Sequence, residues 1–120
     1  MFRSVIEEDK YGNSQVKFYL TQGDSCGILS KPKDESGEAV DPLLIRRVTF
    51  KFMDSSYNVL FQKDLSLQEN GVYLLRLLPE ETSNFSVGDS KYEIEYELND
   101  GGINTTNSWK FTIVQQGVEK

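Results

Sequence analysis

The stretch that decides the fold spans residues 91–114, KYEIEYELNDGGINTTNSWKFTIV. In its first half, four apolar residues alternate with lysine and glutamate: Tyr92, Ile94, Tyr96 and Leu98. This period of two gives a strand one apolar and one charged face, as a strand that covers a core requires. The Asp-Gly pair within residues 99–102 supplies the positive φ of a tight hairpin turn. Apolar residues alternate again over residues 109–114, so the stretch predicts a β-hairpin on which the rest of the domain stacks.

The same alternation recurs along the chain, with turn residues between the segments. It predicts further short strands at residues 16–20, 26–29, 43–53, 59–64 and 72–78. A proline followed by two acids favours a single helical turn near residues 79–84, and Phe85 is expected in the core beneath it. No segment shows a long helical period. The pattern therefore predicts an all-β fold, an immunoglobulin-like antiparallel β-sandwich of about seven to eight strands.

Length and composition fit a single domain of 120 residues. We expect a polar N-terminal arm at residues 1–14, the sandwich at residues 15–115 and a polar C-terminal tail at residues 116–120. No signal peptide is recognisable, and no apolar run approaches the roughly 18 residues of a membrane span. A net charge of −6 gives no electrostatic reason to bind nucleic acid or an anionic membrane. We therefore expect neither of these partners.

The residues that usually carry chemistry are few. The sequence contains no histidine and one cysteine, Cys26, which excludes histidine-activated nucleophiles and a closed thiolate metal site within one chain. We expect Cys26 to be a small buried hydrophobe. Three carboxylates share one strand face, and a solvated outer face explains them better than acid–base catalysis: Glu93, Glu95 and Glu97. Four loop acids lack the spacing of a calcium loop: Asp34, Glu35, Glu38 and Asp41. We predict no enzyme activity and no catalytic, cofactor-binding or metal-binding residue.

Exposed aromatic residues are the remaining candidate for ligand binding. Tyr19, Tyr57 and Trp109 could line a sugar-stacking platform of the kind found in carbohydrate-binding modules. Aromatic side chains of a small sandwich more often lie in its core, which is the simpler interpretation.

Several stretches occur in a familiar order: FYLTQGDS at residues 18–25, SGEAVD at 36–41, VTFKF at 48–52, GVY at 71–73, YEIEY at 92–96 and FTI at 111–113. The succession resembles the immunoglobulin-like N-terminal domain of tailed-phage baseplate upper proteins, over roughly residues 16–114. The Gln-Gly-Asp-Ser element at residues 22–25 is its most distinctive part. One departure is the segment PLLIRR at residues 42–47, where the family loop usually continues smoothly into a strand.

The resemblance implies a non-catalytic structural or adaptor module of a phage or prophage tail baseplate. Such a module belongs to the virion, is assembled in the bacterial cytoplasm, and has other tail or baseplate proteins as partners. It also implies a homo-oligomer such as a trimer. The alternative is a surface carbohydrate-binding or adhesin-type immunoglobulin-like domain. Four residues match the distinctive element, and we expect them to be structural: Gln22, Gly23, Asp24 and Ser25.

Within this element the glycine permits a kink, and the side chains of Asp24 and Ser25 can satisfy nearby backbone amides. Partners are expected to pair with strand edges at the N-terminal arm and at residues 59–64. Deleting residues 1–13 should then leave the fold intact but weaken assembly.

Overall fold

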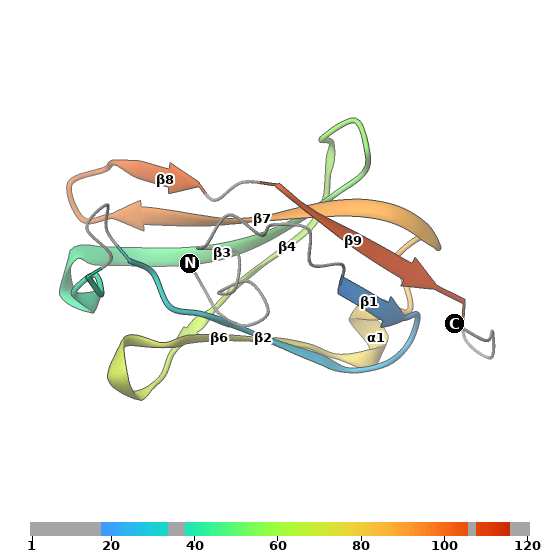
Figure 1. Ribbon diagram of the computed structural model, residues 1–120, viewed down its shortest axis with the longest axis horizontal. Coiled ribbons are helices and arrows are strands. Elements are labelled where there is room, and N and C mark those ends of the chain that lie inside the picture. Colours follow the sequence, from blue (N-terminus) through green and yellow to red (C-terminus); the bar gives the residue numbers. More distant parts are fainter. Residues whose placement is uncertain (1–17, 34–37, 106–107, 116–120) are drawn as a thin grey trace.

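The computed structural model describes residues 18–33, 38–105 and 108–115, and these form two β-sheets packed face to face (Figure 1). Sheet A contains, in spatial order, β1 (Phe18–Thr21), β9 (Trp109–Val114), β7 (Gly88–Leu98), β3 (Ile45–Met53) and β4 (Val59–Asp64). The short β8 (Ile103–Thr105) also pairs with β7. Sheet B contains β2 (Cys26–Ser30), β6 (Tyr73–Leu77) and β5 (Ser66–Leu67). The predicted β-sandwich is confirmed. The predicted arm at residues 1–14 and tail at 116–120 lie outside the described residues, as do the side chains of Phe18, Tyr19, Asn70 and Trp109.

The hairpin that organises the sequence is the centre of sheet A. Its turn is fixed by Gly101 at φ 92° and by the carboxylate of Asp100, which accepts the Gly102 N–H at 2.8 Å. The return segment differs from the prediction because it forms two pieces, β8 beside one end of β7 and β9 beside the other. The sequence pattern predicts a turn over residues 87–90 before the central strand, and this prediction is wrong because β7 already begins at Gly88. The early start follows from tertiary pairing, because Gly88 lies opposite Ile113 on β9.

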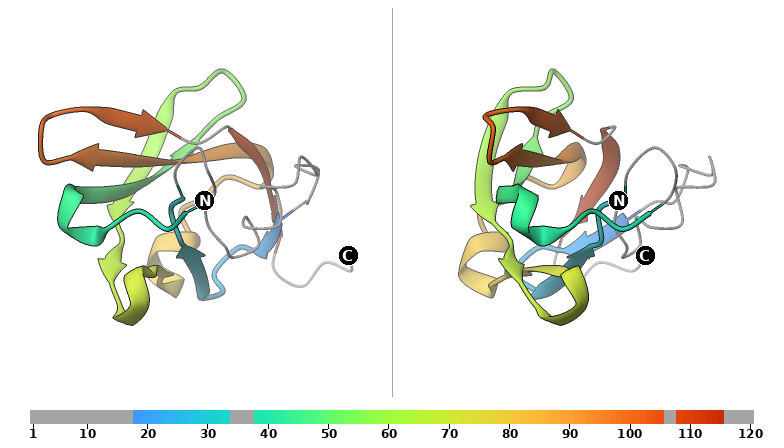
Figure 2. Two further views of the ribbon diagram at one scale, coloured as in Figure 1. Left: turned by 60° about the vertical axis from the view of Figure 1, so that its left-hand side comes forward. Right: turned by 90° about the vertical axis from the view of Figure 1, so that its left-hand side faces the viewer.

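One strand pair departs from the antiparallel pattern. β1 runs parallel to β9, with Phe18 opposite Phe111 and Thr21 opposite Val114. The chain then crosses from the edge of sheet A to β2 in sheet B, and the two layers are separate in Figure 2. All other described strand pairs are antiparallel.

The third predicted strand begins later than expected. Residues Pro42–Leu44 form a 3₁₀ turn, η2, in place of the start of a strand over residues 43–53. Proline opens this turn, and the carboxylate of Asp41 accepts the Leu43 N–H at 3.0 Å. β3 and β4 correspond to two predicted strands and pair with each other as a hairpin, with a bulge next to Phe52.

The core lies between the inner faces of the two sheets. Its fully buried side chains follow the predicted alternation: Ile28, Val48, Phe50, Phe52, Leu75, Leu77, Tyr92, Ile94, Phe111 and Ile113. Burying each large side chain contributes roughly 1.5–3 kcal/mol, so these faces carry most of the folding free energy. One polar pair is buried among them, a hydrogen bond between the hydroxyls of Ser30 and Tyr96.

The predicted helical turn is present as α1 (Pro79–Thr82), at one end of the sandwich (Figure 1). The carboxylate of Glu81 accepts the Leu78 N–H at 2.8 Å and thereby caps the turn. Phe85 follows in the core, as expected, and its ring stacks on that of Phe52 with centroids 4.2 Å apart. The 3₁₀ turn η3 (Glu69–Gly71) precedes β6, and the two-residue β5 was not predicted from the sequence.

Candidate functional site

The Gln-Gly-Asp-Ser element forms the link by which the chain passes from sheet A to sheet B. Gly23 has φ 89°, a conformation that favours glycine. Gln22 donates its side-chain amide to the backbone oxygen of Phe85 at 2.9 Å. In return, the buried Thr82 donates its hydroxyl to the backbone oxygen of Asp24 at 2.7 Å. We call these two hydrogen bonds the reciprocal clasp, because they join residues 22–24 to residues 82–85 from both sides.

The clasp uses backbone oxygens and the Gln22 side chain, whereas sequence reasoning assigned hydrogen bonding to the side chains of Asp24 and Ser25. Both of these residues are exposed. Their role therefore stays a prediction, and the four-residue element is placed at a structural junction of the two sheets.

The carboxylates of β7 lie on the outer face of sheet A, opposite basic residues of β3. Glu97 pairs with Arg46 and Arg47, each at 3.2 Å, and Glu95 pairs with Lys51. Glu93 accepts a hydrogen bond from the Ser108 hydroxyl at 2.6 Å. Among the described residues, no group of three or more acids or cysteines is placed to hold a metal ion. The geometry is that of a charged outer face whose acids are matched by bases and a hydroxyl.

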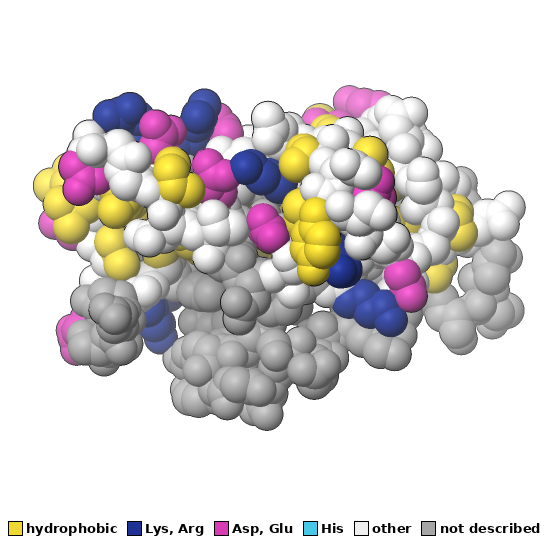
Figure 3. All heavy atoms as spheres, turned by 90° about the horizontal axis from the view of Figure 1, so that it is seen from above, with side chains coloured by type: hydrophobic (Ala, Val, Ile, Leu, Met, Phe, Trp, Pro, Cys, Tyr) yellow, Lys and Arg dark blue, Asp and Glu magenta, His cyan; other side chains and the backbone are white. Residues whose placement is uncertain are grey.

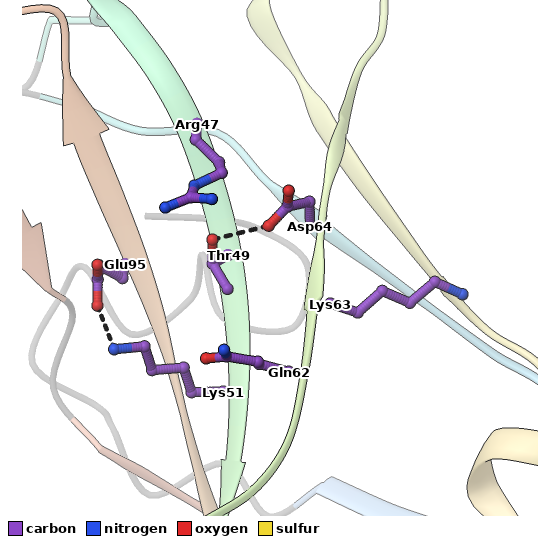
Figure 4. A pocket seen from close by; sticks show the side chains of 7 residues that line it. All are labelled: Arg47, Thr49, Lys51, Gln62, Lys63, Asp64 and Glu95. Atoms are coloured by element: carbon purple, nitrogen blue, oxygen red, sulfur yellow. Dashed lines mark hydrogen bonds and ion pairs between the residues drawn. The ribbon is translucent and has the colours of Figure 1, made fainter.

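A shallow polar groove of about 460 Å³ runs over β3 and β4 on this face (Figure 4). Its lining residues are Arg47, Thr49, Lys51, Gln62, Lys63, Asp64 and Glu95. Thr49 donates its hydroxyl to Asp64 at 2.9 Å. Figure 4 shows Lys63 pointing away from the other side chains, and its ammonium reaches Glu81 at 2.9 Å and the backbone oxygen of Arg76 at 2.8 Å. Burial alone would raise the pKa of Glu81, but the Leu78 N–H and Lys63 together lower it.

One end of the outer face carries an exposed aromatic ring, Tyr57, at the tip of the β3–β4 hairpin. The Lys91 ammonium lies 4.1 Å from the centre of this ring and 3.0 Å from its hydroxyl. The hydrogen bond from Lys91 lowers the pKa of Tyr57. The predicted platform also included Tyr19 and Trp109, whose side chains lie outside the described parts of the structure. Sequence reasoning therefore found Tyr57 but missed Lys91 as its neighbour, because the pair joins segments far apart in the chain.

The edge of sheet A at β4 is a second candidate surface. Within the described residues, β4 has one strand neighbour, β3. Leu65 donates its N–H to Val48 at 2.8 Å, and alternate residues of an antiparallel strand turn their backbone groups to opposite sides. Gln62 and Asp64 therefore direct their N–H and C=O groups to the open edge.

A small groove of about 170 Å³ lies beside this edge, between β4 and α1. Its lining residues are Phe52, Leu60, Phe61, Glu80, Glu81, Asn84, Phe85 and Ser86. The rings of Phe61 and Phe85 meet edge to face with centroids 5.3 Å apart, and Leu60 is 54% exposed beside them. Within the described parts of the chain, the β4 edge thus combines unpaired backbone groups with an apolar floor and an acidic rim, features that suit an added strand.

Other candidates from the sequence are structural in this fold. Cys26 packs against the core, and burial raises the pKa of its thiol to about 11, which suppresses the reactive thiolate. Asp41 caps η2, while Asp34 and Glu35 lie outside the described residues.

Figure 3 looks onto sheet A and shows hydrophobic side chains at the end that holds the β7–β8 turn. The exposed aliphatic residues of that end are Leu43, Leu44 and Ile103.

No family model and no curated protein matches this sequence. The fold is similar to that of CopC from Methylosinus trichosporium OB3b, with a TM-score of 0.50 and 11% identity over 87% of this chain and 89% of that chain. It is also similar to the fibronectin(III)-like modules of Clostridium thermocellum CbhA, with a TM-score of 0.51 and 16% identity over 82% of this chain and 88% of that chain.

The immunoglobulin-like domain of mouse leukocyte-associated immunoglobulin-like receptor 1, solved as a strand-swapped dimer, aligns with a TM-score of 0.48 and 10% identity over 87% of this chain and 92% of that chain. No helix in the described ranges is long and apolar enough to cross a membrane. Likeness at such low identities concerns the fold alone. The chain is an immunoglobulin-like or fibronectin(III)-like β-sandwich, an architecture that many interaction modules share.

Proposed function

We propose that this domain is a non-catalytic structural or adaptor module of a phage or prophage tail baseplate, which contacts neighbouring subunits along the β4 edge. The observation that carries the proposal is the open edge itself. A strand with outward N–H and C=O groups is ready to pair with another chain, and natural sheets usually protect such an edge. Here the edge carries the charged Lys63 and Asp64, and an apolar groove lined by Leu60 and Phe61 flanks it.

Two further features support the assignment to tails. The ordered motif resemblance covers nearly the whole described chain, including the element at residues 22–25. The described residues also lack the clustered acids of a metal site, and the β7 carboxylates are matched by bases. Partners are then other tail or baseplate proteins, with further copies of this chain in a closed ring.

The test combines localisation with a surface substitution. Particles released after prophage induction are labelled with gold-conjugated antibody against the domain and viewed by electron microscopy. We expect gold at the tail tip. Leu60→Asp should prevent incorporation, because it places a charge in the apolar groove. Leu67→Asp is the matched control, since Leu67 on β5 is 52% exposed, close to the 54% of Leu60.

Two different results would contradict the two parts of this proposal. Unlabelled particles beside labelled cell walls would contradict the tail assignment. Normal incorporation of Leu60→Asp would contradict the role of the β4 edge while leaving the tail assignment in place.

The second candidate function is recognition of a surface glycan by an adhesin-type domain. The exposed ring of Tyr57, next to a polar groove, is the observation that favours it.

A further inference from the structure

The hairpin tip at Tyr57 is held in an unusual backbone conformation. Tyr57 has φ 68°, a left-handed value that glycine and asparagine adopt readily and bulky residues rarely do. The loop around it is well ordered by Asp54, which accepts the N–H groups of Ser56 and Asn58, each at 2.9 Å. The turn thus holds a disfavoured residue in place. Strain of this kind is found mainly at positions selected for what the side chain does.

Burial does not explain the choice of tyrosine, because Tyr57 stays 54% exposed. The Lys91 ammonium stands over one face of the ring at 4.1 Å from its centre. More than half of the residue is accessible, so ring surface remains available to a ligand beside the ammonium. The strained turn therefore presents a partly exposed aromatic ring beside the outer surface of sheet A.

Polar groups surround this ring on the side of β7. The Lys91 ammonium bonds the tyrosine hydroxyl at 3.0 Å, and the Glu93 carboxylate bonds Ser108 at 2.6 Å. Glu93 lies opposite Lys51 in the register of β7 and β3, and Lys51 is part of the polar groove. The ring and the 460 Å³ groove are therefore neighbouring parts of one surface.

From this arrangement we propose, resting on the second candidate function above, that the outer face of sheet A is a saccharide-binding groove with Tyr57 as the stacking residue at one end. The exposed part of the Tyr57 ring would receive the apolar face of a pyranose ring. The hydroxyl groups of the following sugar units would meet donors and acceptors along the groove: Thr49, Lys51, Gln62, Asp64 and Glu95.

The charge of the groove selects a neutral ligand. Two bases, Arg47 and Lys51, face two acids, Asp64 and Glu95. The ammonium of Lys63 is engaged by Glu81 away from the groove. A phosphate-bearing polymer would need an excess of positive charge, and a protein partner would need an apolar centre that this groove lacks. An uncharged oligosaccharide needs neither.

The experiment is an amide NMR titration of the intact chain with four neutral probes: chitohexaose, cellohexaose, maltohexaose and mannohexaose, each at up to about 5 mM, where millimolar binding is visible. We expect saturable shifts for at least one probe, centred on Tyr57 and the groove. Tyr57→Asn removes the ring but keeps a residue suited to the left-handed turn, and it should weaken binding roughly tenfold. Tyr57→Phe keeps the ring and should retain most of the affinity.

Two controls separate this site from the β4 edge and from misfolding. Leu67→Asp should bind as the parent does, and circular dichroism should report the same fold for every variant. Leu60→Asp should also bind normally, so that the saccharide site and the assembly edge can fail independently. The proposal is overturned if no probe binds saturably, if the shifts map to sheet B, or if Tyr57→Asn binds as tightly as the parent.

Discussion

Removing one arm of the reciprocal clasp should destabilise the fold by a measurable and predictable amount. Thr82→Val keeps the shape of the side chain but deletes the hydroxyl that donates to the backbone oxygen of Asp24 at 2.7 Å. Thr82 is fully buried, so the substitution leaves the Asp24 oxygen without this donor. A lost hydrogen bond costs about 1 kcal/mol, and the Asp24 oxygen, left without this donor in a part-buried position, adds about 1 kcal/mol. We expect a loss of about 2 kcal/mol in the free energy of unfolding.

The other arm is more accessible and should matter less. Gln22→Ala removes the donor to the Phe85 oxygen, which is bonded at 2.9 Å in a partly buried position. We expect a loss of about 1 kcal/mol. The two arms join the same segments, so losing one should loosen the other. The double variant should then lose at least about 0.5 kcal/mol less than the sum of the single losses.

Equilibrium unfolding in urea, followed by circular dichroism, measures these changes. With a slope of about 2 kcal/mol per molar urea, Thr82→Val should lower the midpoint by about 1 M. Thr112→Val is the matched control, because its hydroxyl donates to Asp89 on the outer face of the same sandwich. It should change stability by less than about 0.5 kcal/mol. Equal small losses for Thr82→Val and Thr112→Val would refute the clasp as a stabilising junction.

Four further outcomes are expected. Gly23→Ala should lower the free energy of unfolding by about 1 kcal/mol or more, because a φ of 89° is strained for any residue with a side chain. Gly27→Ala should be nearly neutral, because there is space for a Cβ at Gly27, and the midpoints of urea unfolding compare the two variants. At constant pH, Cys26 should react with a thiol reagent about a hundredfold more slowly in the folded protein than in the unfolded chain. The reason is that folding raises its pKa from 9.0 to about 11 and so lowers the fraction of reactive thiolate. Folding lowers the pKa of Glu81, so the contribution of its carboxylate to stability is complete above pH 4.5 and is lost as the pH falls through the lowered pKa. Urea unfolding at several pH values should therefore show a smaller loss of stability in acid for Glu81→Gln than for the parent. Deleting residues 1–13 should leave the circular dichroism spectrum unchanged and weaken assembly, and an unfolded product would make those residues part of the sandwich.

The alternation of residues 92–98 was sufficient to predict the central strand, its buried face and its turn. It worked because a half-buried strand imposes a period of two on its sequence, whatever lies around it. The helical turn at Pro79 and the buried Phe85 were predictable for a similar local reason. The start of β7 at Gly88 was not, because a glycine and an aspartate enter a strand only when β9 offers them partners.

Contacts between distant segments could not be predicted from local sequence patterns. The clasp connects Gln22 to Phe85, and the Tyr57 cluster connects a hairpin tip to Lys91. Each residue is ordinary in its own stretch, and only the topology brings the partners together. Among the described residues, β4 lies at the edge of sheet A, as the prediction for residues 59–64 required, and partner pairing there stays a prediction. The groove beside this edge required Phe85 from another segment. Local patterns thus predicted elements, whereas surfaces made from several elements needed the structure.

The parallel pairing of β1 with β9 has a mechanical consequence. The chain enters β1 at Phe18 and leaves β9 at Val114, at opposite ends of the paired region. Tension applied through the flanking segments would drag the two strands past each other, so that their hydrogen bonds are loaded in shear and must yield together. An antiparallel terminal pair would instead be peeled open one bond at a time. Forced unfolding depends on the height of this barrier rather than on equilibrium stability. A domain of this topology is therefore suited to transmit a pulling force along its chain.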